Sequence, residues 1–233
     1  MKIALIVAGG TGSRMANLKT PKQFVLINGK HLIVYTIEAF QNHPEIDKII
    51  VVCLNDYLDD MKNICEQYQL DKVEAIVPGG NTRQLSVSVG LKTALNIGMQ
   101  DDDIILIHDG ARPLVTPEII SKNIEDCKTF EAVDTVIRAT DTIIKSEDNI
   151  TIGDIPNRNE LYQSQTPQTF KYRLIVSAHN HAIEEGETNA TDDATLVLKI
   201  GHKIHLVEGN KMNFKITTDE DLKIFESLTK SMS

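Results

Sequence analysis

A glycine-rich loop with two basic residues beside it follows the first apolar segment of the chain. Residues 2–7 read KIALIV, a pattern typical of a strand that is buried on both faces. Five small residues come directly after this segment, namely Ala8, Gly9, Gly10, Thr11 and Gly12. Glycines let a backbone turn sharply and bring its amide N–H groups close to an anion. Because Arg14 and Lys22 add positive charge nearby, the pattern indicates a site for nucleotide phosphates.

Two common phosphate-binding loops are excluded by their spacing. The P-loop ends in Gly-Lys followed by Ser or Thr, a tripeptide that does not occur in the chain. The dinucleotide fingerprint fails because its third glycine, after Gly10 and Gly12, would be Met15. The remaining pattern, A-G-G-x-G-[ST]-R-M followed by P-K-Q, resembles a signature of nucleotidyltransferases that act on sugar and polyol phosphates. An ordinary strand-to-helix turn would also use glycines, but the further motifs of the chain make that interpretation a minor one.

Residues 79–86, GGNTRQLS, form a second segment suited to a nucleotide. We expect a base to lie against the glycine backbone, with Asn81 and Ser86 as hydrogen-bond partners and Ser86 also as the N-cap of a helix. A surface of backbone and amide groups suits cytosine, which offers an N4 donor and O2 and N3 acceptors. A plain capped helix start is the alternative interpretation.

Asp109 lies in the segment HDGARP, residues 108–113, at the carboxyl end of an expected strand. A carboxylate at this position is well placed to hold Mg²⁺ against phosphate oxygens, whereas the alternative is a turn cap. We expect Arg112 to form structural ion pairs and His108 to be a core residue. Lys215 has apolar neighbours in an expected short strand, so it is either a guard against edge-to-edge aggregation or an active-site cation.

Polar residues that could face a phosphate or a polyol occur later in the chain, at Thr142, Arg158 and Thr166. Thr142 belongs to residues 140–151, a predicted hairpin with a polar tip at residues 147–149. An exposed hairpin with ordinary threonines explains Thr142 equally well. Because a polar excursion inside an α/β chain often packs on a partner subunit, we expect an arm that joins two copies of the chain.

The apolar pattern predicts alternating strands and helices. Strands are expected at residues 2–7, 48–54, 73–77, 104–108, 132–139, 203–207 and 214–216. Helices are expected at residues 31–40, 56–68, 86–97, 117–127, 172–184 and 218–228. This order implies a parallel sheet with helices on both faces, whose ligands bind at the carboxyl ends of the strands. The motifs at 9–14, 79–86 and 108–113 all follow strands and should therefore meet at one edge.

The composition excludes several classes of protein. A net charge of −9 and a pI near 5.3 argue against a nucleic-acid binder, so the basic residues that matter must gather in one cleft. The three cysteines include no C-x-x-C pair, and we expect buried thiols in a reducing cytoplasm. The N-terminus resembles a core strand rather than a signal peptide, and no apolar run approaches the length of a membrane span.

Six ordered motifs run along the chain: AGGTGSRM at 8–15, PKQF at 21–24, GGNTR at 79–83, HDGARP at 108–113, QTPQTF at 165–170 and NFKITT at 213–218. Together they resemble the IspD/TarI family of cytidylyltransferases over nearly the whole chain. The resemblance implies an enzyme that couples CTP to a polyol phosphate with Mg²⁺ and releases pyrophosphate. It also implies a Rossmann-like three-layer α/β/α sandwich with a mostly parallel sheet, a single domain over 1–233. An extended arm at about 140–168 would build a homodimer.

The resemblance also implies roles for individual residues, and the opening loop at 8–12 would wrap the triphosphate of CTP. The remaining assignments are Arg14, Lys22 and Lys215 as phosphate-stabilising cations; Gly80, Asn81, Arg83 and Ser86 in the CTP pocket; Asp109 as the metal ligand; and Thr142, Arg158, Thr166 and Thr191 near the polyol phosphate.

Two branches of this family differ in their acceptor, which is methylerythritol 4-phosphate in one and ribitol 5-phosphate in the other. The stretches 132–136, 140–143 and 154–163 resemble the ribitol branch, whereas residues 109–112, DGAR, are closer to the other. We favour ribitol because the arm is expected to touch the acceptor. In both branches the acceptor phosphate is already an anion that can attack the α-phosphorus of CTP in line, so no general base is needed.

Two other interpretations stay open on the sequence alone. A nucleotide-binding regulatory subunit with the same fold would lack the phosphate cations, yet Arg14, Lys22 and Lys215 are all present. A sugar-1-phosphate transferase that uses UTP or dTTP is disfavoured by the QTPQ segment at 165–168.

Overall fold

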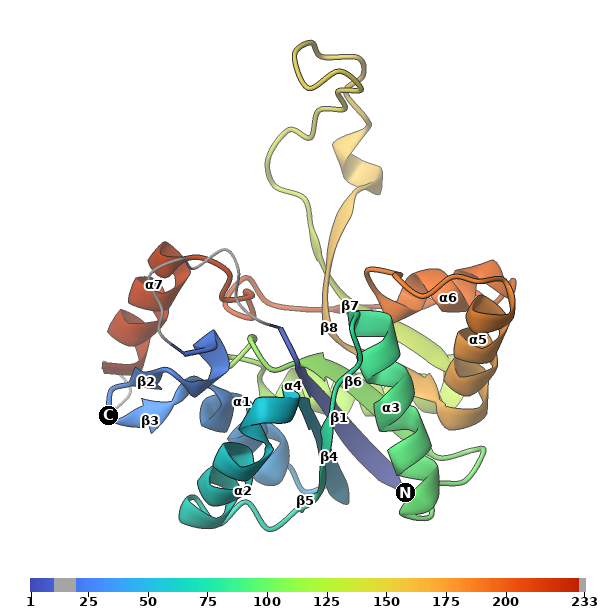
Figure 1. Ribbon diagram of the computed structural model, residues 1–233. Coiled ribbons are helices and arrows are strands. Elements are labelled where there is room, and N and C mark those ends of the chain that lie inside the picture. The colour runs from blue at the N-terminus through green and yellow to red at the C-terminus, as the bar shows by residue number, and fades with distance from the viewer. Residues whose placement is uncertain (11–19, 231–233) are drawn as a thin grey trace.

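A seven-stranded sheet forms the centre of the computed structural model, which describes residues 1–10 and 20–230 (Figure 1). In sheet order the strands are β5 (Val73–Pro78), β4 (Lys48–Cys53), β1 (Lys2–Ala8), β6 (Ile104–Asp109), β8 (Tyr162–Lys171), β7 (Ala132–Arg138) and β9 (His205–Glu208). A small separate hairpin joins β2 (Leu26–Ile27) and β3 (Lys30–His31). Strands β1, β4, β5, β6, β7 and β9 each overlap a strand predicted from the sequence, whereas β8 and the small hairpin were not predicted.

The sheet is mostly parallel, as predicted, and one strand runs against the others. Strands β5, β4, β1 and β6 are parallel neighbours, and β9 is parallel to β7. Strand β8 is antiparallel to both β6 and β7. The carboxyl ends of β1, β5 and β6 therefore meet at one edge of the sheet, and the first residues of β8 reach the same edge.

Helices cover both faces of the sheet and make three layers. Helices α1 (Leu32–Gln41), α2 (Leu58–Gln67) and α4 (Pro117–Phe130) pack on one face. Helices α3 (Arg83–Asn96), α5 (Tyr172–Glu184) and α6 (Asp193–Lys199) pack on the other. Successive strand residues point to opposite faces, so the fully buried Ala4 joins the first core and the fully buried Leu5 the second. The predicted three-layer α/β/α arrangement is confirmed.

The last helix, α7 (Asp219–Lys230), packs on a small core of its own. Phe225 is fully buried there with Ile27, Leu32 and Ile216. Short 3₁₀ turns lie at Lys22–Phe24, Asn55–Tyr57 and Arg158–Glu160. Among the described residues, no helix combines the length and apolarity that crossing a bilayer requires.

Two local predictions were wrong, and one helix was missed. The helix expected at 86–97 begins at Arg83, because Thr82 rather than Ser86 is its N-cap and accepts a hydrogen bond from the Leu85 N–H. Residues 214–216 do not form a strand. The Ile216 N–H donates to the Ala111 carbonyl, which lies in a loop rather than in a neighbouring strand. Helix α6 was not predicted, because seven residues give too short a pattern.

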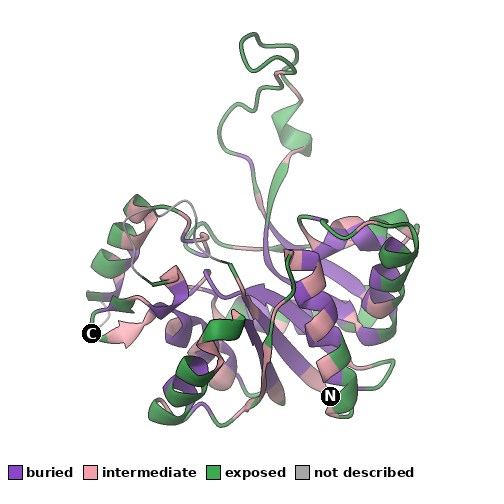
Figure 2. Ribbon diagram, in the orientation of Figure 1, coloured by how far each residue is buried: buried purple, intermediate pink, exposed green. Residues whose placement is uncertain are grey.

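Residues 139–161 form an arm that projects far from the sheet (Figure 1) and is almost entirely exposed (Figure 2). Its two sides meet, within this described segment, at an isolated β-bridge between Lys145 and Asp154 rather than along the predicted hairpin ladder. The polar tip folds around Asp148, whose carboxylate accepts hydrogen bonds from the N–H groups of Ile150 and Thr151. Several isoleucines of the arm are exposed, namely Ile143, Ile144, Ile150, Ile152 and Ile155.

Candidate active site

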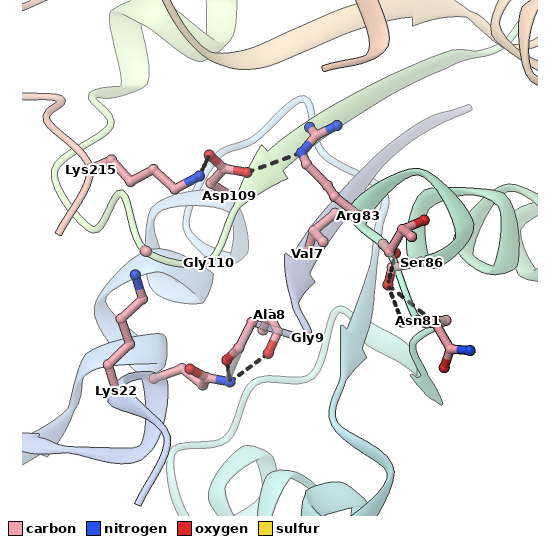
Figure 3. A pocket seen from close by; sticks show the side chains of 15 residues that line it. Val7, Ala8, Gly9, Lys22, Asn81, Arg83, Ser86, Asp109, Gly110 and Lys215 are labelled. Carbon is pink, nitrogen blue, oxygen red and sulfur yellow. Dashed lines mark hydrogen bonds and ion pairs between the residues drawn. The ribbon is translucent and has the colours of Figure 1, made fainter. Parts of the chain in front are cut away.

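A pocket of about 340 Å³ opens where the carboxyl ends of β1, β5 and β6 meet (Figure 3). Ten of the residues predicted for the site line this pocket: Ala8, Gly9, Gly10, Lys22, Gly80, Asn81, Arg83, Ser86, Asp109 and Lys215. Thr11, Gly12 and Arg14 lie outside the described residues. The segments that follow β1, β5 and β6 therefore meet at one edge of the sheet, as predicted.

The residues predicted to bind the acceptor do not line this pocket. Thr142 and Arg158 are exposed on the arm, where an Nη1–H of Arg158 donates to the Thr140 carbonyl at 3.0 Å. Thr191 is exposed in the loop before α6. Thr166 is buried behind Asp109. An acceptor site that included all four residues would therefore have to extend beyond the pocket, toward the arm and the start of α6.

Gln23 holds the backbone of the opening loop, a role that the sequence reasoning missed. Its side-chain amide donates to the carbonyls of Ala8 at 2.6 Å and Gly10 at 3.1 Å, and the residue is 4% exposed. These two contacts hold Ala8 and Gly10 at a defined position in the pocket lining. The sequence signal was present, since Gln23 directly follows Lys22 in the PKQF motif.

The second glycine segment is shaped by Ser86 inside the first turn of α3. The Ser86 hydroxyl accepts a hydrogen bond from Gly80 N–H at 3.1 Å and donates to the Thr82 carbonyl at 2.9 Å. A Cβ on Gly80 would lie 2.5 Å from Leu85 Cβ, so a side chain does not fit there without movement of the backbone. Asn81, next to this glycine, lines the pocket.

Asp109 is a buried carboxylate with three cations around it. Lys215 Nζ lies 2.8 Å away, Arg83 Nε 3.6 Å and Arg112 Nε 3.7 Å. Burial alone would raise the pKa of Asp109, but Lys215, Arg83 and Arg112 together hold that pKa well below its ordinary value. The carboxylate is therefore ionised at all physiological pH values. The prediction that Arg112 forms ion pairs is confirmed, and its guanidinium also donates to the Asn213 carbonyl.

The two pocket lysines are tied to the same irregular segment. Lys215 belongs to that segment, and the Lys22 ammonium donates to the carbonyl of the next residue, Ile216, at 2.6 Å. Ile216 N–H in turn donates to the Ala111 carbonyl at 2.9 Å, next to the Asp109 loop. One stretch of backbone thus sets the spacing between both cations and the carboxylate.

His108 and Thr166 support Asp109 from behind. His108 is fully buried, with Nε2–H donating to the Arg112 carbonyl at 3.1 Å. Its Nδ1 then accepts from the Thr166 hydroxyl at 3.0 Å, and that hydroxyl accepts from Asp109 N–H at 3.1 Å. The expectation of a core histidine is confirmed. The Thr166 hydroxyl thus uses its proton and one of its two lone pairs within the protein, and its role toward an acceptor stays a prediction.

The pocket fits a metal that arrives with a phosphate ligand. No group of three or more His, Cys, Asp or Glu side chains within residues 1–10 and 20–230 could hold a metal ion by itself. Mg²⁺ is commonly held by one or two carboxylates together with substrate phosphates and water. Asp109 supplies one such carboxylate, and Lys22, Arg83 and Lys215 supply positive charge for a polyphosphate.

The chain is similar over nearly its whole length to cytidylyltransferases. The sequence profile of the family described as IspD, 2-C-methyl-D-erythritol 4-phosphate cytidylyltransferase, matches residues 2–231. A ribitol-5-phosphate cytidylyltransferase from Streptococcus agalactiae is 40% identical over 228 residues, 98% of this chain and 95% of that protein. A 2-C-methyl-D-erythritol 4-phosphate cytidylyltransferase from Clostridium novyi is 40% identical over 230 residues, 98% of this chain and 96% of that protein. The crystal structure of 4-diphosphocytidyl-2C-methyl-D-erythritol synthase from Anaerococcus prevotii has a TM-score of 0.82 and 30% identity, covering 99% of this chain and 98% of that one.

Neutral His108 should make the fold sensitive to mild acid. Burial, the largest cause, lowers the pKa of His108 to about 4, whereas an unfolded histidine titrates near 6.5. The unfolded chain therefore takes up the proton first, and stability is lost as pH falls from about 6.5 toward 4. Between pH 7 and pH 5 this histidine should cost about 2 kcal/mol of unfolding free energy.

Urea unfolding at pH 7 and pH 5 measures this effect. His108→Asn, whose amide oxygen can replace Nδ1 as acceptor, should lose about 2 kcal/mol less than the wild type over that interval. His181→Asn, at an exposed position of α5, is the matched control and should keep the wild-type loss. Equal pH dependence of His108→Asn and the wild type would contradict the argument.

Proposed function

This chain belongs to the 2-C-methyl-D-erythritol 4-phosphate cytidylyltransferase (IspD) family of nucleotidyltransferases, and from that premise we propose that its acceptor is D-ribitol 5-phosphate. The enzyme transfers CMP from CTP to this polyol phosphate and gives CDP-ribitol and pyrophosphate. Transfer to 2-C-methyl-D-erythritol 4-phosphate is the second candidate. It is favoured by the relative from Clostridium novyi and by the DGAR sequence at 109–112.

The observation that carries the proposal is the cluster of Asp109, Lys215, Arg83 and Lys22 around one pocket at the carboxyl edge of the sheet. A cluster of this composition suits a triphosphate. The ribitol assignment rests on relatives that bear that name at 36–40% identity over 228 to 234 residues, including one from Lactiplantibacillus plantarum. The stretch 154–163, on the arm, supports it further.

In the proposed reaction the backbone of the loop from Ala8 through Gly12 wraps the triphosphate of CTP, with Arg14 beside it. Gly80, Asn81 and Ser86 form the surface for the cytosine. The acceptor phosphate attacks the α-phosphorus in line, and pyrophosphate leaves on the opposite side. Lys22 and Lys215 neutralise the charge that develops on the α-phosphoryl oxygens and the leaving group. Mg²⁺ bound at Asp109 supplies further positive charge at the phosphate oxygens.

We also propose that two chains form a homodimer through the arm, and that the reaction takes place in the cytoplasm. The arm makes few contacts with its own chain and exposes five isoleucines, a composition that favours burial against a second copy. The arm at residues 139–161 would then exchange across a two-fold axis. Residues 162–168, which the sequence prediction included in the arm, belong instead to β8 of the central sheet. Thr142 and Arg158 would approach the acceptor from the arm, together with Thr166 and Thr191.

A substrate panel with CTP tests the acceptor. Ribitol 5-phosphate should release pyrophosphate with a kcat/KM at least tenfold above methylerythritol 4-phosphate, glycerol phosphates and xylulose 5-phosphate, since the loss of one ordinary hydrogen bond costs about that much. EDTA should abolish the release. The reverse preference, for methylerythritol 4-phosphate, would replace the proposed acceptor by the second candidate.

Removal of the pocket lysine tests the charge stabilisation. Lys215→Ala should lower kcat by roughly 10²–10³, as expected when one preorganised partner of a developing charge is lost. Lys211→Ala is the matched control, because Lys211 is exposed in the same segment and does not line the pocket. Steady-state pyrophosphate release measures both variants. A Lys215→Ala enzyme with wild-type kcat would exclude Lys215 from the mechanism.

Arg158→Ala tests the arm. If Arg158 binds the acceptor phosphate by a charge-assisted fork, the variant should raise the KM for ribitol 5-phosphate about tenfold or more and leave the KM for CTP unchanged. Subunits with Arg158→Ala mixed with subunits with Lys215→Ala should recover one active site of two if the arm serves the neighbouring subunit. A monomer in light scattering, or a defect limited to CTP, is incompatible with an exchanged arm.

A further inference from the structure

A buried acid–histidine pair lies behind the pocket, and no step of the proposed reaction uses it. Asp193, at the start of α6, is 1% exposed, and His179 on α5 is 2% exposed. His179 Nε2 lies 3.0 Å from Asp193 Oδ1. The Asp193 backbone N–H donates to the Gln168 side chain on β8 at 3.0 Å. A buried carboxylate is strongly unfavourable unless it is paired, so these contacts fix Asp193 at one position.

The pair reaches the pocket through Arg83. Asp193 Oδ2 accepts a hydrogen bond from Arg83 Nη1 at 2.7 Å, while Arg83 Nε lies 3.6 Å from Asp109 Oδ1 (Figure 3). The guanidinium is thus held between two carboxylates, one that lines the pocket and one behind it. A guanidinium is planar and carries five N–H donors in a fixed fork. When Asp193 fixes one of them, it also sets the direction of the others.

Ser88 completes a Ser-His-Asp series with this pair, but its surroundings favour a structural role over a nucleophilic triad. The Ser88 hydroxyl lies 3.0 Å from His179 Nδ1 and also within hydrogen-bond distance of the Gln84 carbonyl. Ser88, His179 and Asp193 are all buried, and none of them lines the pocket of the candidate active site. Ser88 and His179 border a separate cavity of about 100 Å³ between α3 and α5, away from the cations of the candidate active site. This place supports a structural role, in which His179 holds Asp193.

We propose that Asp193, supported by His179, is a positioning residue of the nucleotide site and acts through Arg83. It holds the guanidinium on the α6 side of the pocket, so that the remaining N–H groups face the phosphates of bound CTP. It also keeps Arg83 from closing onto Asp109. The inference rests on the proposed binding of CTP in this pocket, and it adds a determinant of CTP affinity outside the pocket lining.

The charges of the cluster agree with this role. Burial alone would lower the pKa of Arg83, but Asp193 first and then Asp109 raise it above its ordinary value. Burial would raise the pKa of Asp193, yet Arg83 and the hydrogen bond from His179 lower it. Both groups are therefore ionised, and the Arg83–Asp193 pair persists at neutral pH. Without the Asp193 charge, Arg83 would be left with Asp109, the carboxylate that already has Lys215 beside it.

A double-mutant cycle on CTP binding tests the inference. The Kd for CTP is measured by titration calorimetry with Mg²⁺ for Arg83→Ala, Asp193→Asn and the double variant. Arg83→Ala should raise Kd about 10- to 100-fold, and Asp193→Asn about tenfold, the range for a lost charge-assisted hydrogen bond. The double variant should bind CTP no more weakly than Arg83→Ala. Additive effects, or an unchanged Kd in Asp193→Asn, would overturn the proposal.

Matched variants separate positioning from folding. Asp192→Asn removes the neighbouring charge but keeps a good N-cap for α6, so its Kd for CTP should equal that of the wild type. His179→Gln can still donate to Asp193 and should bind CTP more tightly than His179→Phe. In the Arg83→Ala background these two should have the same Kd. If Asp193→Asn fails to fold, the comparison of His179→Gln with His179→Phe tests the inference instead. A difference in Kd between these two variants in the Arg83→Ala background would contradict the positioning role.

The identity of the acceptor does not enter this experiment. The cycle uses CTP alone, so a failure to convert ribitol 5-phosphate refutes the proposed acceptor and leaves the cycle intact. An additive cycle refutes the positioning role and leaves the acceptor assignment intact.

Discussion

The ionised carboxylate of Asp109 is the interaction around which the site is built. Lys215, Arg83 and Arg112 come from separate parts of the chain, and each lies within 4 Å of this one group. Without the carboxylate, three cations at such spacing would repel one another; without the cations, a buried carboxyl group would take up a proton. The carboxylate and its cations thus stabilise each other, and their ion pairs fix the positions of the charged side chains around the pocket.

Much of the fold could be predicted from local patterns of apolar residues in the sequence. The apolar runs at 48–54 and 104–108 lie in strands. A short run that is apolar throughout is typical of a parallel strand that is buried on both faces. Helix α5 spans the residues predicted for it, 172–184. The pocket residues Gly80 and Asp109 could be predicted for the same reason, since both follow parallel strands whose carboxyl ends share an edge.

Other features depend on partners that are distant in sequence and carry no local signal. Gln23 matters because its amide meets the carbonyls of the opening loop. Asp193 and His179 meet only once α6 has packed against α5. Ser86 looked like a helix cap by type, but Thr82 takes that place, and the serine hydroxyl is free to bind the Gly80 backbone. In each case a side chain of ordinary type acquires its role from tertiary packing.

The hydrogen bond between Lys22 and the Ile216 carbonyl joins residues that are 194 positions apart. Lys215, the residue before Ile216, is as distant from the opening loop. A nascent chain can pair β1, β4 and β5 early during synthesis, yet the ring of charges around Asp109 stays incomplete until its last segment leaves the ribosome. Assembly of the cation cluster is therefore a late, long-range event in folding. A translation product truncated before Lys215 would carry the sheet edge and Asp109 without the lysine that pairs with it.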